Sequence, residues 1–207
     1  MSRFHITKKQ LWAMTKTRKL NRRCVLQILR DAFNRCVDYD YAWGHILHEE
    51  DLRANVYGYT REILDKAPDW RVFCDLTLPR ESAKPDLIFF HSSDNHKKHE
   101  AIEILVEVKH WPNKKQILSD IQKLIKLGGK FKSQRSPPTL IFIAILGDKI
   151  DDVNDGKTGK LEQELGQEFN NPKVKAKIWF RRHRNLYCGP WNESKNRDPW
   201  RFCLESI

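Results

Sequence analysis

Two short apolar runs, separated by a polar loop, constrain the fold of this chain more than any other feature of its sequence. The runs span residues 84–90 and 103–109, and the polar loop spans residues 91–100. Each run has the length of a β-strand and is bounded by polar residues that favour turns. Side chains alternate between the two faces of a strand, so the aliphatic side chains at even positions from Ile102 to Val108 are expected to face a core.

Three of the charged residues in these runs are candidates for a site. Asp86 is near the start of the first run, and Glu107 and Lys109 share the odd-numbered face of the second. Neighbouring strands lie about 5 Å apart, so Asp86 can stand beside Glu107. Unpaired buried charge is costly, and a hard divalent cation such as Mg²⁺ is bound by carboxylate oxygens. The two carboxylates are therefore candidate metal ligands.

A helix is expected earlier in the chain than these two runs, over residues 48–66. Apolar residues recur there at helical spacing from Leu52 to Ile63. Glu49 lies three residues before Leu52, so it continues the inward face of the helix. Its neighbour Glu50 is expected to point outward.

The rest of the chain predicts a mixed α/β fold. We expect strands at residues 70–78 and 139–146, helices at residues 113–127 and 157–169, and an edge strand with a basic face at residues 173–182. The strand at 139–146 is aliphatic throughout, which is typical of a central strand covered on both faces. Asp120 and Lys123 lie near the sheet side of their helix, and both a surface ion pair and a catalytic role remain open for them.

The order of these elements over residues 45–182 resembles the PD-(D/E)xK nuclease superfamily, which has the restriction-endonuclease-like fold. Pro85-Asp86 matches the first half of its motif and Glu107-x-Lys109 matches the second half. Glu49 matches the acidic residue that many members carry on the first helix. The resemblance implies an α/β fold with an α-β-β-β-α-β core, in which helices flank a mixed central sheet.

The resemblance also implies an activity, the hydrolysis of phosphodiester bonds by an endonuclease that depends on Mg²⁺, for which Mn²⁺ would substitute. Asp86 and Glu107 would hold the metal, with Glu49 and the main-chain carbonyl of Val108 as further ligands. Lys109 would orient the attacking water or help to deprotonate it. The alternative is a catalytically silent nucleic-acid-binding or assembly subunit on the same fold, in which Lys109 and Glu107 form a structural ion pair.

Net charge favours nucleic acid as the partner, with DNA expected rather than RNA. The chain carries 38 basic and 27 acidic residues, for a formal charge of +11. Candidate phosphate contacts are Lys8, Lys9, Arg18, Lys19, Arg22 and Arg23 in an N-terminal arm, and Lys173, Lys175 and Lys177 on the edge strand. The alternative for the arm is a helical pair packed on the main domain, in which Asn21 caps the second helix.

Three regions are expected: a basic helical N-terminal extension (1–44), a nuclease-like core (45–185) and a C-terminal tail (186–207). The five cysteines form no Cys-x-x-Cys pair, which argues against a disulfide framework and a zinc site. The longest apolar run, residues 140–146, is too short to cross a membrane. A cytoplasmic protein is expected, and the sequence leaves the oligomeric state open, a homodimer included.

Overall fold

The computed structural model describes residues 20–78, 84–92, 101–131, 137–146 and 176–182. In chain order the elements are α2 (Arg22–Arg35), the π-helix η1 (Cys36–Tyr41), α3 (Glu49–Leu64), β1 (Trp70–Cys74), β2 (Leu87–His91), β3 (Ala101–His110), α4 (Lys114–Gly129), β4 (Thr139–Leu146) and β5 (Ala176–Arg182). The predicted helix at 157–169 lies outside the described residues, as does the start of the predicted edge strand.

The five strands form one mixed sheet, in the order β1-β2-β3-β4-β5. The strands β1, β2 and β3 form an antiparallel meander, whereas β4 runs parallel to β3 and β5 runs parallel to β4. The helix α4 supplies the crossover that a parallel pair requires. The predicted α/β class and mixed sheet are therefore confirmed.

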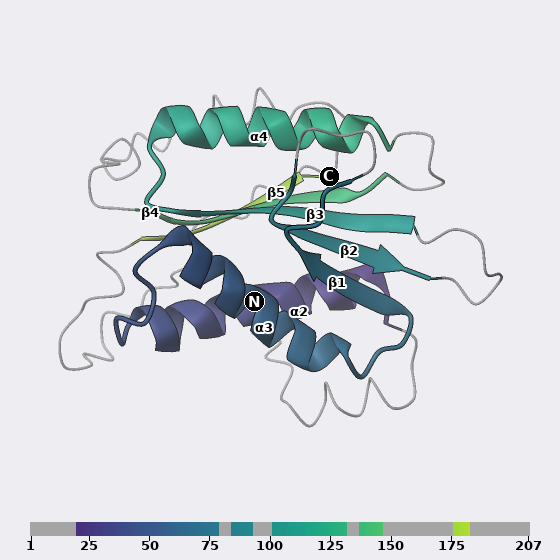
Figure 1. Cartoon of the computed structure of the whole chain (residues 1–207), viewed down its shortest axis with the longest axis horizontal. Helices are drawn as coiled ribbons and strands as arrows, with labels where there is room; N and C mark the ends of the chain where they lie inside the picture. Colours follow the sequence, from purple (N-terminus) through teal and green to yellow (C-terminus); the bar gives the residue numbers. More distant parts are fainter. Residues whose placement is uncertain (1–19, 79–83, 93–100, 132–136, 147–175, 183–207) are drawn as a thin grey trace, which may run out of the picture.

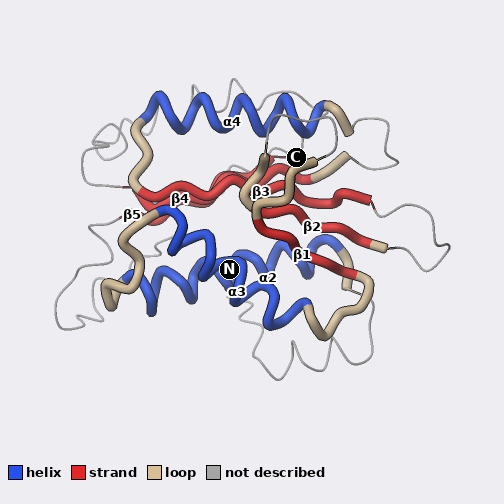
Figure 2. The backbone as a smooth tube through the Cα atoms, in the orientation of Figure 1, coloured by secondary structure: helices blue, strands red, loops and turns tan. Residues whose placement is uncertain are grey.

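Helices cover both faces of this sheet (Figures 1 and 2). The helix α4 lies on one face, and α2 and α3 lie together on the other. Two apolar cores result, one between the sheet and α2/α3 and one between the sheet and α4. Every residue of β4 is buried, as the sequence predicts for a doubly covered strand.

The helix α2 packs on the main domain. Asn21 caps it, because its side chain accepts a hydrogen bond from the Cys24 amide at 3.0 Å. Ile28 and Phe33 are fully buried in the same core as residues of α3 and β3. The packing interpretation of this part of the N-terminal extension is therefore confirmed.

Strand β1 is shorter than predicted. It ends at Cys74, because Asp75 adopts a positive φ of 56° and leaves the extended conformation. The Asp75 amide instead donates to the main-chain carbonyl of Asp86 at 3.0 Å. This turn holds the end of β1 against the residue that precedes β2.

A β-bulge interrupts β3. Phe89 pairs with Ile104 but Phe90 pairs with Ile102, so Glu103 is one extra residue in the strand. Ile102 therefore belongs to the α4 core, whereas Ile104 and the later even positions belong to the α2/α3 core. The expectation that all even positions share one face is wrong at Ile102, because the bulge shifts the alternation.

No helix in the described ranges is long and apolar enough to span a bilayer.

Two helical glycines give a matched test of the packing. A Cβ atom at Gly128 would lie 2.7 Å from Cδ2 of Leu140, which is buried in β4, whereas a Cβ at Gly58 would meet nothing within 4 Å. We expect Gly128→Ala to lower the free energy of unfolding by about 1–2 kcal/mol, because overpacking outweighs the gain in helix propensity. Gly58→Ala should raise it by up to about 1 kcal/mol. Urea unfolding measures both, and equal stabilisation by the two variants would contradict the close approach of α4 to β4.

Candidate active site

Asp86 and Glu107 meet where β2 begins and β3 nears its end. Leu87 pairs with Val106, and one step further along the two antiparallel strands brings Asp86 opposite Glu107. Asp86 is almost fully buried, and its Oδ2 accepts a hydrogen bond from the Val108 amide at 2.7 Å. The predicted neighbourhood of the two carboxylates is thus present in the structure.

Lys109 lies at the centre of the site. Its Nζ is 2.8 Å from Oε1 of Glu49 on α3 and 3.0 Å from Oε1 of Glu107 on β3. Oδ2 of Asp120, on α4, lies 4.0 Å from the same nitrogen. Burial by itself lowers the pKa of the ammonium group, but the surrounding carboxylates outweigh burial and raise the pKa. Lys109 is therefore held in its charged form.

The surroundings of Glu107 raise the pKa of its carboxyl group and so favour its neutral form. Burial raises its pKa most, and the negative charge of Asp86 raises it further, against the opposing effect of Lys109. Asp120 adds a smaller contribution of the same sign as Asp86. Burial and two neighbouring carboxylates therefore oppose the ionisation of Glu107, although the Lys109 ammonium lies 3.0 Å away.

Arg53 is a site residue that the sequence reasoning missed. Its Nη1 lies 3.0 Å from Oδ1 of Asp86 and 3.2 Å from Oδ1 of Asp75. The signal was present, because Arg53 follows Glu49 by four residues and so shares its face of α3. Arg53 thus adds a second cation beside Lys109 to offset the carboxylates.

Asp120 has two partners, and both open interpretations of it have support. Its Oδ1 accepts a hydrogen bond from Lys123 at 2.7 Å, and the Lys123 side chain is 67% exposed, so a helix-surface ion pair is present. Asp120 itself is buried and faces Lys109 at 4.0 Å. Asp120 therefore also contributes negative charge to the site.

The structure places Val108 and the predicted phosphate contacts as follows. The main-chain amide of Val108 contacts Asp86, through the hydrogen bond described above. Arg22 forms an ion pair with Glu103 at the bulge of β3, and its Nη1 donates to the Pro137 carbonyl at 3.1 Å. Arg23 is exposed on the first turn of α2. Lys8, Lys9, Arg18, Lys19, Lys173 and Lys175 lie outside the described residues, and the Lys177 side chain is not described.

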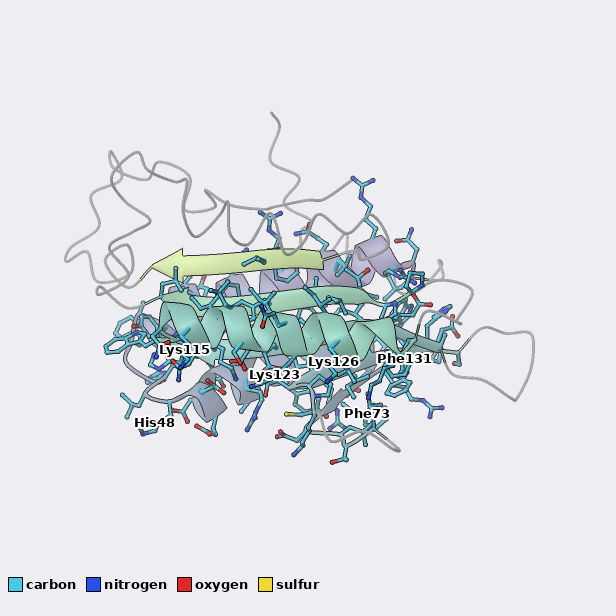
Figure 3. The ribbon with its side chains drawn as sticks, turned by 90° about the horizontal axis from the view of Figure 1, so that it is seen from above. His48, Phe73, Lys115, Lys123, Lys126 and Phe131 are labelled. Atoms are coloured by element: carbon cyan, nitrogen blue, oxygen red, sulfur yellow. The ribbon has the colours of Figure 1, made fainter. Side chains whose placement is uncertain are left out.

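A further basic surface lies on α4, and the sequence reasoning did not select it. Lys115, Lys123 and Lys126 are exposed along this helix (Figure 3). The sequence could have revealed these lysines, because they fall between the apolar positions that recur at helical spacing and are buried in α4.

The side chains of the site offer the oxygen donors that a hard divalent cation takes. Four carboxylates, those of Glu49, Asp86, Glu107 and Asp120, face three cationic side chains, those of Lys109, Arg53 and the exposed Lys123. Each carboxylate offers oxygen atoms with about four lone-pair directions, so one hydrogen bond or ion pair does not exhaust it. Within the described ranges, no group of three or more histidine, cysteine, aspartate or glutamate side chains is arranged to hold a metal ion. Lys109 lies between Glu49 and Glu107, where it offsets the charge of both.

Comparison of the chain with models of protein families, with curated proteins and with solved structures found no match.

The Arg53–Asp86 pair allows a direct test of the charge balance. Arg53→Met should lower the free energy of unfolding by about 2–4 kcal/mol, because it leaves the buried Asp86 carboxylate beside Glu107 without its guanidinium partner. The double variant Arg53→Met/Asp86→Asn should be less destabilised than the sum of the two single changes. Chemical denaturation of all three variants measures the coupling.

Arg61→Met is the matched control, on the same helix. Arg61 is exposed and pairs with Asp65 at 3.5 Å, so its loss should leave the stability close to that of the wild type. Additive effects of the Arg53 and Asp86 changes would show that the two side chains do not interact in solution.

Proposed function

We propose that this chain is a divalent-metal-dependent endonuclease of the PD-(D/E)xK type, which hydrolyses phosphodiester bonds of DNA in preference to RNA. The observation that carries the proposal is the position of Lys109 Nζ, within 3.0 Å of one oxygen of Glu49 and one of Glu107. Asp86 stands across from Glu107 on the adjacent strand. The motif residues of the resemblance thus come from three separate elements and gather in one place.

Stability alone does not explain why these charged side chains are gathered in one place. A buried ion pair is often no more stabilising than apolar residues of the same volume, and the four carboxylates of this site outnumber its three cations. A function that uses the excess charge is therefore the better explanation. Phosphodiester hydrolysis requires a positioned water and positive charge near the phosphoryl oxygens, where negative charge grows in the transition state.

The residues of the chain would divide these tasks. Asp86 and Glu107 would hold the cation, with Glu49 as a further ligand. When bound, Mg²⁺ supplies Lewis-acid charge to the phosphoryl group and to the attacking water. Lys109 has three N–H donors, which can orient that water and offset charge on the phosphate. Arg53 would hold the Asp86 carboxylate in a fixed orientation through its bond at 3.0 Å.

Cleavage tests the proposal directly. The wild-type chain should nick or degrade DNA in Mg²⁺ or Mn²⁺ and should be inactive in EDTA. Lys109→Met and Glu107→Gln should each reduce the rate at least about 100-fold, the scale of losing one electrostatic contact in a transition state. Circular dichroism and thermal melting would establish that both variants are folded. The proposal fails if the wild type cleaves none of single-stranded DNA, duplex DNA and RNA.

Metal binding gives a second readout that does not depend on turnover. Mg²⁺ at 100 times its dissociation constant should stabilise the wild type by about 2.7 kcal/mol, a rise of roughly 5–10 °C in Tm for a chain of this size. The rise should vanish in Asp86→Asn and shrink in Glu49→Gln, because each change removes a ligand charge.

Glu50→Gln is the control for the second readout, because Glu50 is the exposed neighbour of Glu49 on the same helix. It should respond to Mg²⁺ like the wild type. A response lost in Glu50→Gln and kept in Glu49→Gln would contradict the ligand assignment on α3.

A catalytically silent nucleic-acid-binding subunit is the second candidate, and one observation favours it. Both oxygens of Asp86 already have partners, Arg53 at 3.0 Å and the Val108 amide at 2.7 Å. Such a subunit would bind DNA with an affinity that falls steeply with salt. It would show neither cleavage nor the Mg²⁺-induced rise in Tm, so the same two assays separate the candidates.

A further inference from the structure

An aromatic cluster includes the two residues that follow Lys109 in the chain. It consists of Tyr41, His110 and Trp111, which we call the aromatic platform. The His110 and Trp111 rings are stacked, with centroids 5.2 Å apart and planes 20° apart. Tyr41 meets His110 edge to face at 5.8 Å, and the indole N–H of Trp111 donates to the Tyr41 hydroxyl at 3.1 Å. Residues far apart in the sequence thus hold one another in a fixed arrangement.

Trp111 is held in place and yet exposed. Its φ of 52° lies in the left-handed region, where a bulky side chain is strained and persists only because its surroundings fix it. The Trp111 amide is fixed by a hydrogen bond to the Ile145 carbonyl at 2.8 Å. In spite of these restraints, Trp111 remains 53% exposed. A large apolar ring is thus held at the protein surface, although the backbone that carries it is strained.

The segment after Tyr41 extends this exposed aromatic surface. Tyr41 ends the π-helix η1, a rare conformation that occurs frequently at functional sites. Trp43 follows two residues later and is 76% exposed. Its amide donates to the Tyr39 carbonyl at 3.1 Å, so the turn that carries Trp43 is anchored to η1.

The platform adjoins the charged site along the chain. Trp111 follows Lys109 by two residues, at the end of β3. The chain from η1 leads through Trp43 to α3, whose first residue is Glu49. Both halves of the platform are thus connected by a few residues to the groups that contact Lys109 Nζ.

We propose that the aromatic platform stacks an unpaired base of a nucleic-acid strand whose phosphate lies at Lys109. This inference rests on the proposed function and names its substrate class, a single strand or a duplex with an unpaired base. Bases within a duplex are stacked on one another, whereas an unpaired base has a free face for an aromatic ring. The formal charge of +11 favours a polyanionic occupant over an uncharged protein surface.

Binding in EDTA tests this proposal separately from cleavage. A fluorescent 20-nucleotide single strand and the matching blunt duplex would be titrated at one fixed salt concentration, since affinity depends on salt. Trp111→Ala should weaken single-strand binding about 10-fold or more, which is the usual scale for losing one stacked base. Duplex binding should change less than about twofold. Trp111→Phe should retain most of the single-strand affinity, because a ring remains.

The controls address folding and location. Trp111→Gly removes the ring and also relieves the backbone strain, so loss of binding in this variant cannot come from unfolding of a strained site. Phe73→Ala removes another partly exposed aromatic ring, on β1, which packs edge to face on Phe90 at 5.5 Å. Figure 3 places Phe73 at a distance from His48, the residue that caps α3 beside the site. Phe73→Ala should bind both DNA forms like the wild type.

The outcomes divide clearly. Equal losses of affinity for the single strand and the duplex would overturn the stacking proposal. Unchanged single-strand affinity in Trp111→Ala or in Trp111→Gly would also overturn it. Loss of self-association on sedimentation, with single-strand binding intact, would do the same and would assign the platform to contact between copies of the chain. Selective loss of single-strand binding in a protein that never cleaves would support the platform while the nuclease proposal fails.

Discussion

The ammonium group of Lys109 is the contact on which the arrangement of the site depends. It joins three elements, because Glu49 belongs to α3, Glu107 to β3 and Asp120 to α4. These helices lie on opposite faces of the sheet, so one partly buried ammonium group ties both layers to the end of the same strand. Electrostatic contacts are stronger in a partly buried site than in water, and each partner of Lys109 therefore restricts the positions of the other two.

Local patterns in the sequence were enough to predict much of this arrangement. Helical periodicity placed Glu49 inward and Glu50 outward, and the structure has Glu49 in contact with Lys109 and Glu50 exposed. The alternation of apolar and charged residues predicted β3, and the aliphatic run predicted β4 as a doubly covered strand. These patterns are informative because each helix or strand buries an apolar face, whichever neighbour covers that face.

Features that arise from contacts between elements were not predicted. The pairing of Arg53 with Asp86 joins residues 33 positions apart, and helical spacing places Arg53 on the face of Glu49 without specifying its partner. The bulge at Glu103 depends on how β3 pairs with β2, and it moved Ile102 to the other face. Strand β1 ended early because Asp75 turns back to the main chain of Asp86. In each case a partner from elsewhere in the fold overrode the expectation from the local sequence.

The central position of β4 has a consequence for how the protein is made. β4 contributes Ile141, Ile143 and Ile145 to the core that α2 and α3 cover, yet it is synthesised long after those helices. During translation the apolar faces of α2 and α3 therefore have no complete sheet to pack against until residue 146 has emerged from the ribosome. Pairings of this sequence separation are slow to form, and the surfaces that await them are prone to aggregate. A chain truncated before β4 would accordingly be a client for chaperones rather than a smaller folded domain.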